Sequence, residues 1–144
     1  MSIQRRVQDA EFLWQHKRYE GALLSALIAV AATARLRYPN RKTVKDGEAF
    51  EQFLKAAHSV TLKAEFRGEL HTIEHILYKF FRCELVHDGG LPIDIQFLLD
   101  TEPGVLSVRA GGSPEFILKL SQGWFYHLLH TVVSAPENKG AFQN

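Results

Sequence analysis

Residues 69–92 read ELHTIEHILYKFFRCELVHDGGLP, and the predicted fold is organised around this stretch. Residues three, four and seven apart share one face of a helix, because each residue turns by about 100°. The apolar positions fall on one such face: Ile73, Ile76, Leu77 and Phe80. Titratable positions gather on the roughly opposite face: His71, His75, Tyr78 and Arg82. The stretch therefore predicts a core helix that ends at Asp-Gly-Gly, residues 88–90, and whose polar face is either solvated or meets another molecule.

Length and composition set the class of protein. A chain of 144 residues can bury one hydrophobic core, so a single domain over residues 1–144 is expected. The formal net charge is +1, so any nucleic-acid contact must come from a local patch. The single cysteine, Cys83, excludes an internal disulfide and fits a reducing compartment. The N-terminus lacks the pattern of a signal peptide, and the most apolar run, residues 22–34, is too short to span a bilayer. We therefore expect a cytoplasmic protein with no membrane partner.

Helical periodicity covers most of the chain before the central stretch. Residues 3–16, 19–37 and 46–57 predict three helices, of which 19–37 is apolar on most sides and should be central. Residues 41–45 form a basic loop, and Asp46 is expected to cap the third helix. Residues 60–66 alternate weakly and are expected to be extended.

The region after the central stretch changes character. Residues 92–109 alternate between apolar and polar around the turn Glu102-Pro103-Gly104, which predicts a β-hairpin. Ser113-Pro114-Glu115 then predicts the start of a last helix that reaches about Ser134, followed by a polar tail from about residue 136. The expected fold class is mainly α, with about five helices and a small inserted hairpin.

Two histidine pairs are candidate metal ligands. His71 and His75 lie four apart with Glu74 between them, a spacing that matches the H-x-x-E-H pattern of inverted zinc peptidases. The alternative is a polar seam or a dimer contact, and with no evident third ligand we expect neither a metal nor another cofactor. His127 and His130 stand among aromatic residues, which favours packing.

Arg82 and His87 form a second constellation. Arginine presents a charged fork to a phosphate, and histidine moves protons near neutral pH, a combination that suits cleavage of an RNA phosphodiester. Glu84 lies three residues before His87 and either orients the imidazole or repels phosphate. On one ideal helix, residues five apart diverge by about 140°, so the two groups converge only if the helix unwinds or a second copy contributes. The structural alternative is an ion pair for Arg82 and a favourable helix C-terminus for His87.

The long apolar second helix and the segment LYKFFRCELVHDG, residues 77–89, resemble the HEPN family (higher eukaryotes and prokaryotes nucleotide-binding domains). The resemblance rests on Arg82 and His87, which match that family's arginine and histidine with four residues between them. It implies an HEPN-like helical bundle that acts as a homodimer.

The resemblance also implies an activity, that of a metal-independent endoribonuclease in a toxin–antitoxin or other defence system. Its catalytic residues would be Arg82, His87 and Glu84, and Tyr78, Lys79 and His75 would contact the substrate. RNA or a nucleotide and a protein antitoxin are the expected partners. Two alternatives stay open, a non-catalytic HEPN-like module that binds a nucleotide, RNA or protein, and a plain helical scaffold.

Overall fold

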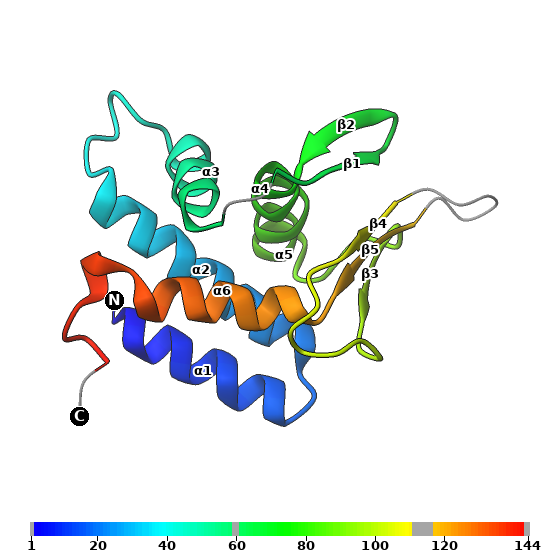
Figure 1. Ribbon diagram of the computed structural model, residues 1–144, viewed down its shortest axis with the longest axis horizontal. Helices are drawn as coiled ribbons and strands as arrows, with labels where there is room; N and C mark the ends of the chain where they lie inside the picture. Colours follow the sequence, from blue (N-terminus) through cyan, green and yellow to red (C-terminus); the bar gives the residue numbers. More distant parts are fainter. Residues whose placement is uncertain (1, 59–60, 111–116, 143–144) are drawn as a thin grey trace.

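The computed structural model describes residues 2–58, 61–110 and 117–142. The first two helices are α1 (Ile3–Gln15) and α2 (Tyr19–Arg37), which pack against each other as the sequence predicts. Helix α2 also contacts α3 (Asp46–Ala57) and α6 (Gly123–Ser134), so it is the central element of the helical layer (Figure 1). Helix α3 begins at Asp46, one residue after its N-cap Lys45, so the predicted cap was placed one position too late.

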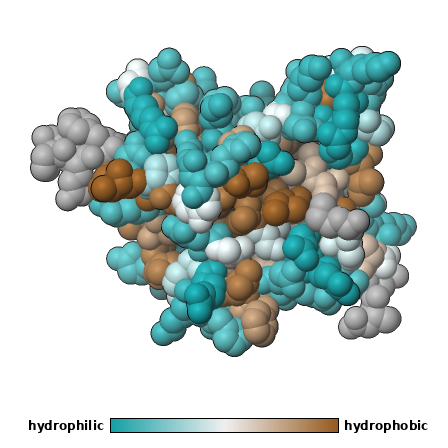
Figure 2. Space-filling model, turned by 180° about the vertical axis from the view of Figure 1, so that it is seen from behind, coloured by the Kyte–Doolittle hydropathy of each residue, from teal (hydrophilic) through white to brown (hydrophobic). Residues whose placement is uncertain are grey.

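Most of the buried side chains of helix α2 are small or branched and apolar. Its buried positions are Ala22, Leu23, Ser25, Ala26, Leu27, Ala29, Val30, Thr33 and Ala34. The helix is apolar and long enough, at 19 residues, to cross a membrane, but half of its most apolar 18-residue window is buried inside the fold, as in the core helix of a soluble domain. Apolar surface gathers near the middle of the face seen from behind, within a polar rim (Figure 2).

The central stretch is helical only from Ile73 onward. Residues Glu69–Thr72 form strand β2, and Thr72 then caps the helix by accepting a hydrogen bond from the backbone of His75. One helical segment follows, in which α4 (Ile73–Ile76) passes into the π-helix η1 (Leu77–Arg82) and then α5 (Cys83–Asp88). The predicted end is confirmed, because Gly89 has φ 77°, the left-handed conformation that favours glycine at a helix C-terminus.

The first four residues of the predicted helix belong instead to a hairpin. Strand β1 (Lys63–Phe66) pairs antiparallel with β2, so the extended conformation expected before the central helix is confirmed for these residues. Arg67 and Gly68 between the strands both have positive φ, the backbone of a tight two-residue hairpin turn. His71 therefore lies on a strand, and the predicted helical stripe of four polar residues is wrong at its first member.

The predicted hairpin over residues 92–109 is wrong in its pairing. Strands β3 (Ile95–Leu98) and β4 (Val108–Arg109) both form, but each pairs with β5 (Leu118–Ser121), which lies between them. Strand β3 is parallel to β5, and β4 is antiparallel to it (Figure 1). Local alternation indicates a strand but not its partner, because pairing depends on packing against distant residues.

The last helix also starts later than the sequence pattern indicated. The expected start at Ser113-Pro114-Glu115 lies outside the described residues, Leu120 belongs to β5, and α6 begins at Gly123. The predicted end at Ser134 is confirmed.

The residues after α6 fold back onto the helices, so the expected polar tail is wrong for residues 136–138. They form a 3-10 turn, η2 (Pro136–Asn138), and Asn138 is only 3% exposed. Its amide donates to Thr33 Oγ1 at 3.0 Å and to the backbone oxygen of Val132 at 2.8 Å. A buried amide needs such partners, which a search for hydrophobic periodicity does not detect.

The class prediction is confirmed: the protein is mainly α, with 56% of the described residues in helices and small sheets beside them. Described core residues from α1, α2, α3, the central helical segment, β5 and α6 form one hydrophobic cluster.

Candidate functional site

A cavity of about 380 Å³ lies where α2, the loop after it, the start of α3 and η1 meet. We call it the arginine cavity. It is lined by Ile28, Ala31, Ala32, Arg35, Arg41, Asp46, Tyr78 and Arg82. The lining holds three guanidinium groups and one carboxylate, so it carries two net positive charges beside apolar side chains of α2. Such a combination is suited to a ligand with an anionic group and an apolar or aromatic part.

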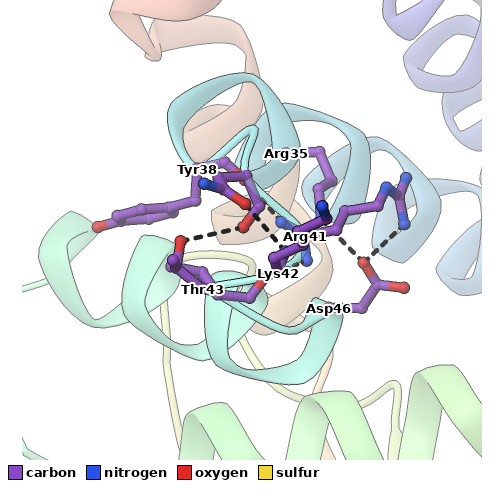
Figure 3. Close-up of polar contacts among 8 residues, drawn as sticks. Arg35, Tyr38, Arg41, Lys42, Thr43 and Asp46 are labelled. Carbon is purple, nitrogen blue, oxygen red and sulfur yellow. Dashed lines mark hydrogen bonds and ion pairs between the residues drawn. The ribbon is translucent and has the colours of Figure 1, made fainter.

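Arg35 is held in place by the loop that it closes. Its Nε donates to Oδ1 of Asp46 at 2.8 Å, and its two terminal nitrogens donate to the backbone oxygens of Tyr38 and Val44 at 2.6 Å each (Figure 3). All three nitrogens thus have protein partners. The sequence places Arg35 on the last turn of α2, where it can reach both the end of its own helix and the start of α3. Its role is to shape the cavity wall while adding positive charge to it.

Asp46 is shared between two arginines. Arg41 Nη1 lies 3.0 Å from the same Oδ1 that Arg35 contacts, and the Arg41 side chain is 69% exposed (Figure 3). The hydrogen bond from Arg35, with added attraction from Arg41, lowers the pKa of Asp46 below its ordinary value. Asp46 therefore stays ionised near neutral pH. Among the described residues Arg41 is bound at one nitrogen only, and its other donors are available to a ligand.

Arg82 is the third arginine that lines the cavity. It is the last residue of η1, and its guanidinium carbon lies 5.6 Å from the centroid of the Tyr78 ring. Its Nε is buried and has no hydrogen-bond partner among the described residues. A buried donor without an acceptor typically costs about 1–3 kcal/mol, so a turn of the Arg82 side chain that brings Nε to an acceptor is favourable. Short π-helical segments occur often at functional sites, which agrees with the position of Arg82.

Tyr78 completes this wall. Burial raises the pKa of the Tyr78 hydroxyl, with a further contribution from Cys83, so the hydroxyl remains protonated near neutral pH. A protonated phenol can donate a hydrogen bond, and its ring supports the neighbouring guanidinium.

Of the six site residues expected from the sequence, two line the arginine cavity, Tyr78 and Arg82. Lys79 is exposed outside the cavity lining, and His75 lies 3.4 Å from Glu51 and stacks on His71.

His87 is exposed in the last turn of α5 and does not line the cavity. Glu84 lies 3.7 Å from Arg67, and a hydrogen bond with Asp88 raises the pKa of its carboxyl group. Within one chain, Arg82 and His87 therefore do not share this cavity.

The sequence reasoning missed Arg35 and Arg41 as site residues and assigned Asp46 only a capping role. A signal existed, because residues 41–45 were recognised as a basic loop directly after an arginine-bearing helix end. A local sequence pattern does not show that this loop folds back beside Arg82, which is 41 positions beyond Arg41 in the chain.

A second polar cluster lies apart from the arginine cavity. His58 Nε2 lies 2.6 Å from Oε1 of Glu74, and both side chains are 7% exposed. His58 Nδ1 lies 3.3 Å from Nε2 of His127 on α6. Burial, together with repulsion from His58 and His130, lowers the pKa of His127. In the sequence Glu74 stands between His71 and His75, but its buried partner is His58.

The zinc-peptidase spacing of His71, Glu74 and His75 is not part of a metal-binding cluster within residues 2–58, 61–110 and 117–142. No group of three or more histidine, cysteine, aspartate or glutamate side chains within these ranges is placed to hold a metal ion.

Comparison with known proteins identifies a family. The sequence profile of the Rv1289 family matches residues 2–143, and the chain belongs to this family, which has no assigned function. No curated protein and no solved structure matches the chain. Nothing in these comparisons links the chain to HEPN proteins.

Proposed function

We propose that this member of the Rv1289 family binds a phosphate group of RNA or of a nucleotide in the arginine cavity. The observation that carries the proposal is the buried Nε of Arg82, which lacks a hydrogen-bond partner among the described residues. A phosphate oxygen supplies the missing acceptor once the Arg82 side chain turns its covered Nε toward the cavity, and the phosphate charge is matched by the two net positive charges of the lining. The proposed function thus corresponds to the nucleotide- or RNA-binding alternative considered from the sequence.

The rest of the cavity suits the remaining parts of a nucleotide. Ile28, Ala31 and Ala32 offer an apolar floor from α2 for a base or a ribose face. The volume of about 380 Å³ lies within the range of about 300–1,000 Å³ that is typical for small-molecule sites. Arg41, held at one nitrogen only, can move onto a second phosphate or onto the next phosphodiester of a strand.

A second candidate function is cleavage of the bound RNA by an HEPN-like homodimer. It is favoured by the exposure of His87 on α5, which leaves the imidazole accessible to a substrate held by the other copy. In that arrangement Arg82 of one copy stabilises charge on the phosphate, and His87 of the other transfers the proton of the 2′-hydroxyl. Such an enzyme needs no metal, and a protein antitoxin would act by covering the site. A cytoplasmic location fits both candidates.

Binding is tested with a fluorescent single-stranded RNA of ten nucleotides, followed by anisotropy at fixed salt. Arg82→Ala should weaken binding about tenfold or more, because a hydrogen bond to a charged group is typically worth about 1.5–3 kcal/mol. Arg5→Ala is the matched control, since Arg5 is an exposed arginine on α1 outside the cavity. Unlabelled adenosine monophosphate and inorganic phosphate are then tested separately as competitors of the labelled RNA. Their relative strengths show whether the site recognises the phosphate alone or the whole nucleotide. Equal loss in both variants, or no binding by the wild type to any of these ligands, contradicts the proposal.

Cleavage is tested on the same RNA with a chelator present. His87→Ala should abolish cutting and leave binding intact, whereas Arg82→Ala should reduce both. The products should carry a cyclic phosphate, and DNA of the same sequence should survive because it lacks the 2′-hydroxyl. Glu84→Gln lowers the cleavage rate if Glu84 orients His87, and raises RNA affinity if Glu84 only repels phosphate. RNA that is bound by the wild type but stays uncut leaves binding as the function and excludes the nuclease.

A further inference from the structure

The second polar cluster ends at a cavity of its own. This cavity has a volume of about 240 Å³ and lies between α3 and α6; we call it the histidine cavity. Its lining consists of Arg37, Phe53, Ala56, Ala57, His127, His130, Thr131, Ser134, Ala135 and Pro136. No residue is shared with the arginine cavity. The two cavities are therefore separate.

Three side chains connect the protein interior with this cavity. Glu74 on α4 is buried and contacts Nε2 of His58 at 2.6 Å. We assign the proton of this contact to Nε2 of His58, because a carboxylate oxygen accepts hydrogen bonds, and this tautomer leaves Nδ1 as an acceptor. Nε2 of His127, 3.3 Å away, then donates to Nδ1 of His58. In this chain of hydrogen bonds every donor points toward Glu74: His127 donates to His58, and His58 donates to Glu74.

This polarity leaves Nδ1 of His127 with a lone pair. No hydrogen bond engages Nδ1 of His127 within the part of the chain that the structure describes. If Nδ1 takes up a proton, the proton on Nε2 can pass to His58, and the positive charge then rests beside Glu74. A buried carboxylate that orients and stabilises an imidazolium is the arrangement by which many hydrolytic enzymes activate a histidine.

We propose that Glu74, His58 and His127 form a hydrolytic site, in which His127 is the general base that activates water against small neutral esters. Glu74 and His58 are positioning residues that act through His127. The preference for neutral substrates follows from Arg37, whose Nε donates to Glu137 at 2.8 Å and whose Nη2 lies 2.6 Å from the same carboxylate oxygen. The ion pair cancels the charge of that wall, so an anionic substrate finds no free cation comparable to Arg82.

A water oxygen attacks the ester carbonyl carbon, and Nδ1 of His127 takes one proton of that water. The proton on Nε2 of His127 moves to Nδ1 of His58, where Glu74 stabilises the imidazolium. The bond from the carbonyl carbon to the leaving oxygen breaks, and its electron pair leaves with that oxygen. The proton returns from His58 through His127 to the leaving group or to solvent, which restores the starting state.

The charged surroundings agree with a base that is neutral near pH 7. The groups that face His127 are His58 from the end of α3, His130 from its own helix and, across the cavity, Arg37 with its partner Glu137. Burial is the largest cause of the lowered pKa of His127, and the two histidines add to it. The imidazole is thus free to accept a proton at physiological pH.

The test uses the full chain with p-nitrophenyl acetate as the probe ester and follows release of p-nitrophenolate. His127→Gln should lower the rate above background by about tenfold or more, since general-base catalysis typically contributes about 10²–10⁴. His16→Gln is the matched control, because His16 is an exposed histidine at the end of α1, outside the histidine cavity. Equal rates for the wild type and His127→Gln, or equal losses in both variants, overturn the proposal.

The positioning role is tested by the dependence of the rate on pH. The rate should rise with pH as His127 loses its proton. Glu74→Gln removes the charge that stabilises the imidazolium, so this rise should move to lower pH while the plateau rate falls. A residue with a purely structural role would lower the amount of folded protein without moving the profile. A pH profile for folded Glu74→Gln that superimposes on that of the wild type excludes the relay. Circular dichroism establishes that each variant is folded before its rate is used.

Discussion

The guanidinium of Arg82 lies over the ring of Tyr78, with 5.6 Å between the guanidinium carbon and the ring centroid. The two residues are four positions apart on the π-helical segment η1, and both line the arginine cavity. A cation over an aromatic face is stabilised by the ring, which orients the side chain without using its hydrogen-bond donors. The ring therefore orients Arg82 without supplying an acceptor to its Nε, which is buried and has no hydrogen-bond partner among the described residues.

Replacing the Tyr78 ring should weaken RNA binding without removing it. Tyr78→Leu deletes the aromatic face, which is typically worth about 0.5–1 kcal/mol to a cation, so affinity should fall by roughly two- to fivefold. Tyr78→Phe keeps the ring and should stay close to the wild type. Anisotropy with the labelled RNA measures both variants. A larger loss for Tyr78→Phe would show that the hydroxyl, rather than the ring, contacts the ligand.

Removing the carboxylate of Asp46 should strengthen phosphate binding. Asp46→Asn frees Arg41 and raises the net charge of the lining by one, so inorganic phosphate and RNA should both bind more tightly. Isothermal titration at low salt measures the change, which should shrink as salt is added. Asp9→Asn serves as the control, because Asp9 also pairs with an arginine, Arg6, but lies outside the arginine cavity. Weaker binding by Asp46→Asn would indicate that Asp46 mainly orients the two arginines.

A side chain at Gly123 should destabilise the junction between β5 and α6. A Cβ atom added there would overlap the backbone oxygen of Val105 and lie 2.9 Å from that of Pro103, and neither backbone atom can rotate away. Gly123→Ala should therefore lower the free energy of unfolding by about 1–3 kcal/mol, measured by urea denaturation. Gly104→Ala is the matched control in the contacted loop, since nothing lies within 4 Å of its added Cβ. A urea midpoint for Gly123→Ala equal to that of the wild type would show that the loop containing Pro103 and Val105 moves to accommodate the added methyl group.

The stability of the protein should depend on pH through His127. Its pKa is lowered in the folded state by burial, His58 and His130, so the unfolded chain takes up a proton at a higher pH. The free energy of unfolding should thus be unaffected by this group well above pH 6.5 and fall as the pH drops through about 6.5 toward the folded pKa. His127→Gln should remove this part of the decline. Urea denaturation at pH 7.5 and pH 5.5 measures it, and identical declines in both proteins would contradict the assignment.

The sequence by itself determined the features that depend on near neighbours. The apolar composition of residues 19–37 predicts a core helix, the glycine at position 89 ends the central segment, and the four-residue spacing of Tyr78 and Arg82 puts them on one wall. These relationships follow from helix geometry and from the conformations open to glycine.

Only the tertiary structure decided which distant residues meet. Strand β5 separates β3 from β4, the loop after α2 brings Arg41 to Arg82, and His58 joins Glu74 to His127 across α3, α4 and α6. Each of these contacts is set by how buried faces pack together, and many pairings are compatible with the same local pattern. Buried polar groups must then find partners within that packing, so both candidate sites emerge from the assembled helices rather than from any one stretch of sequence.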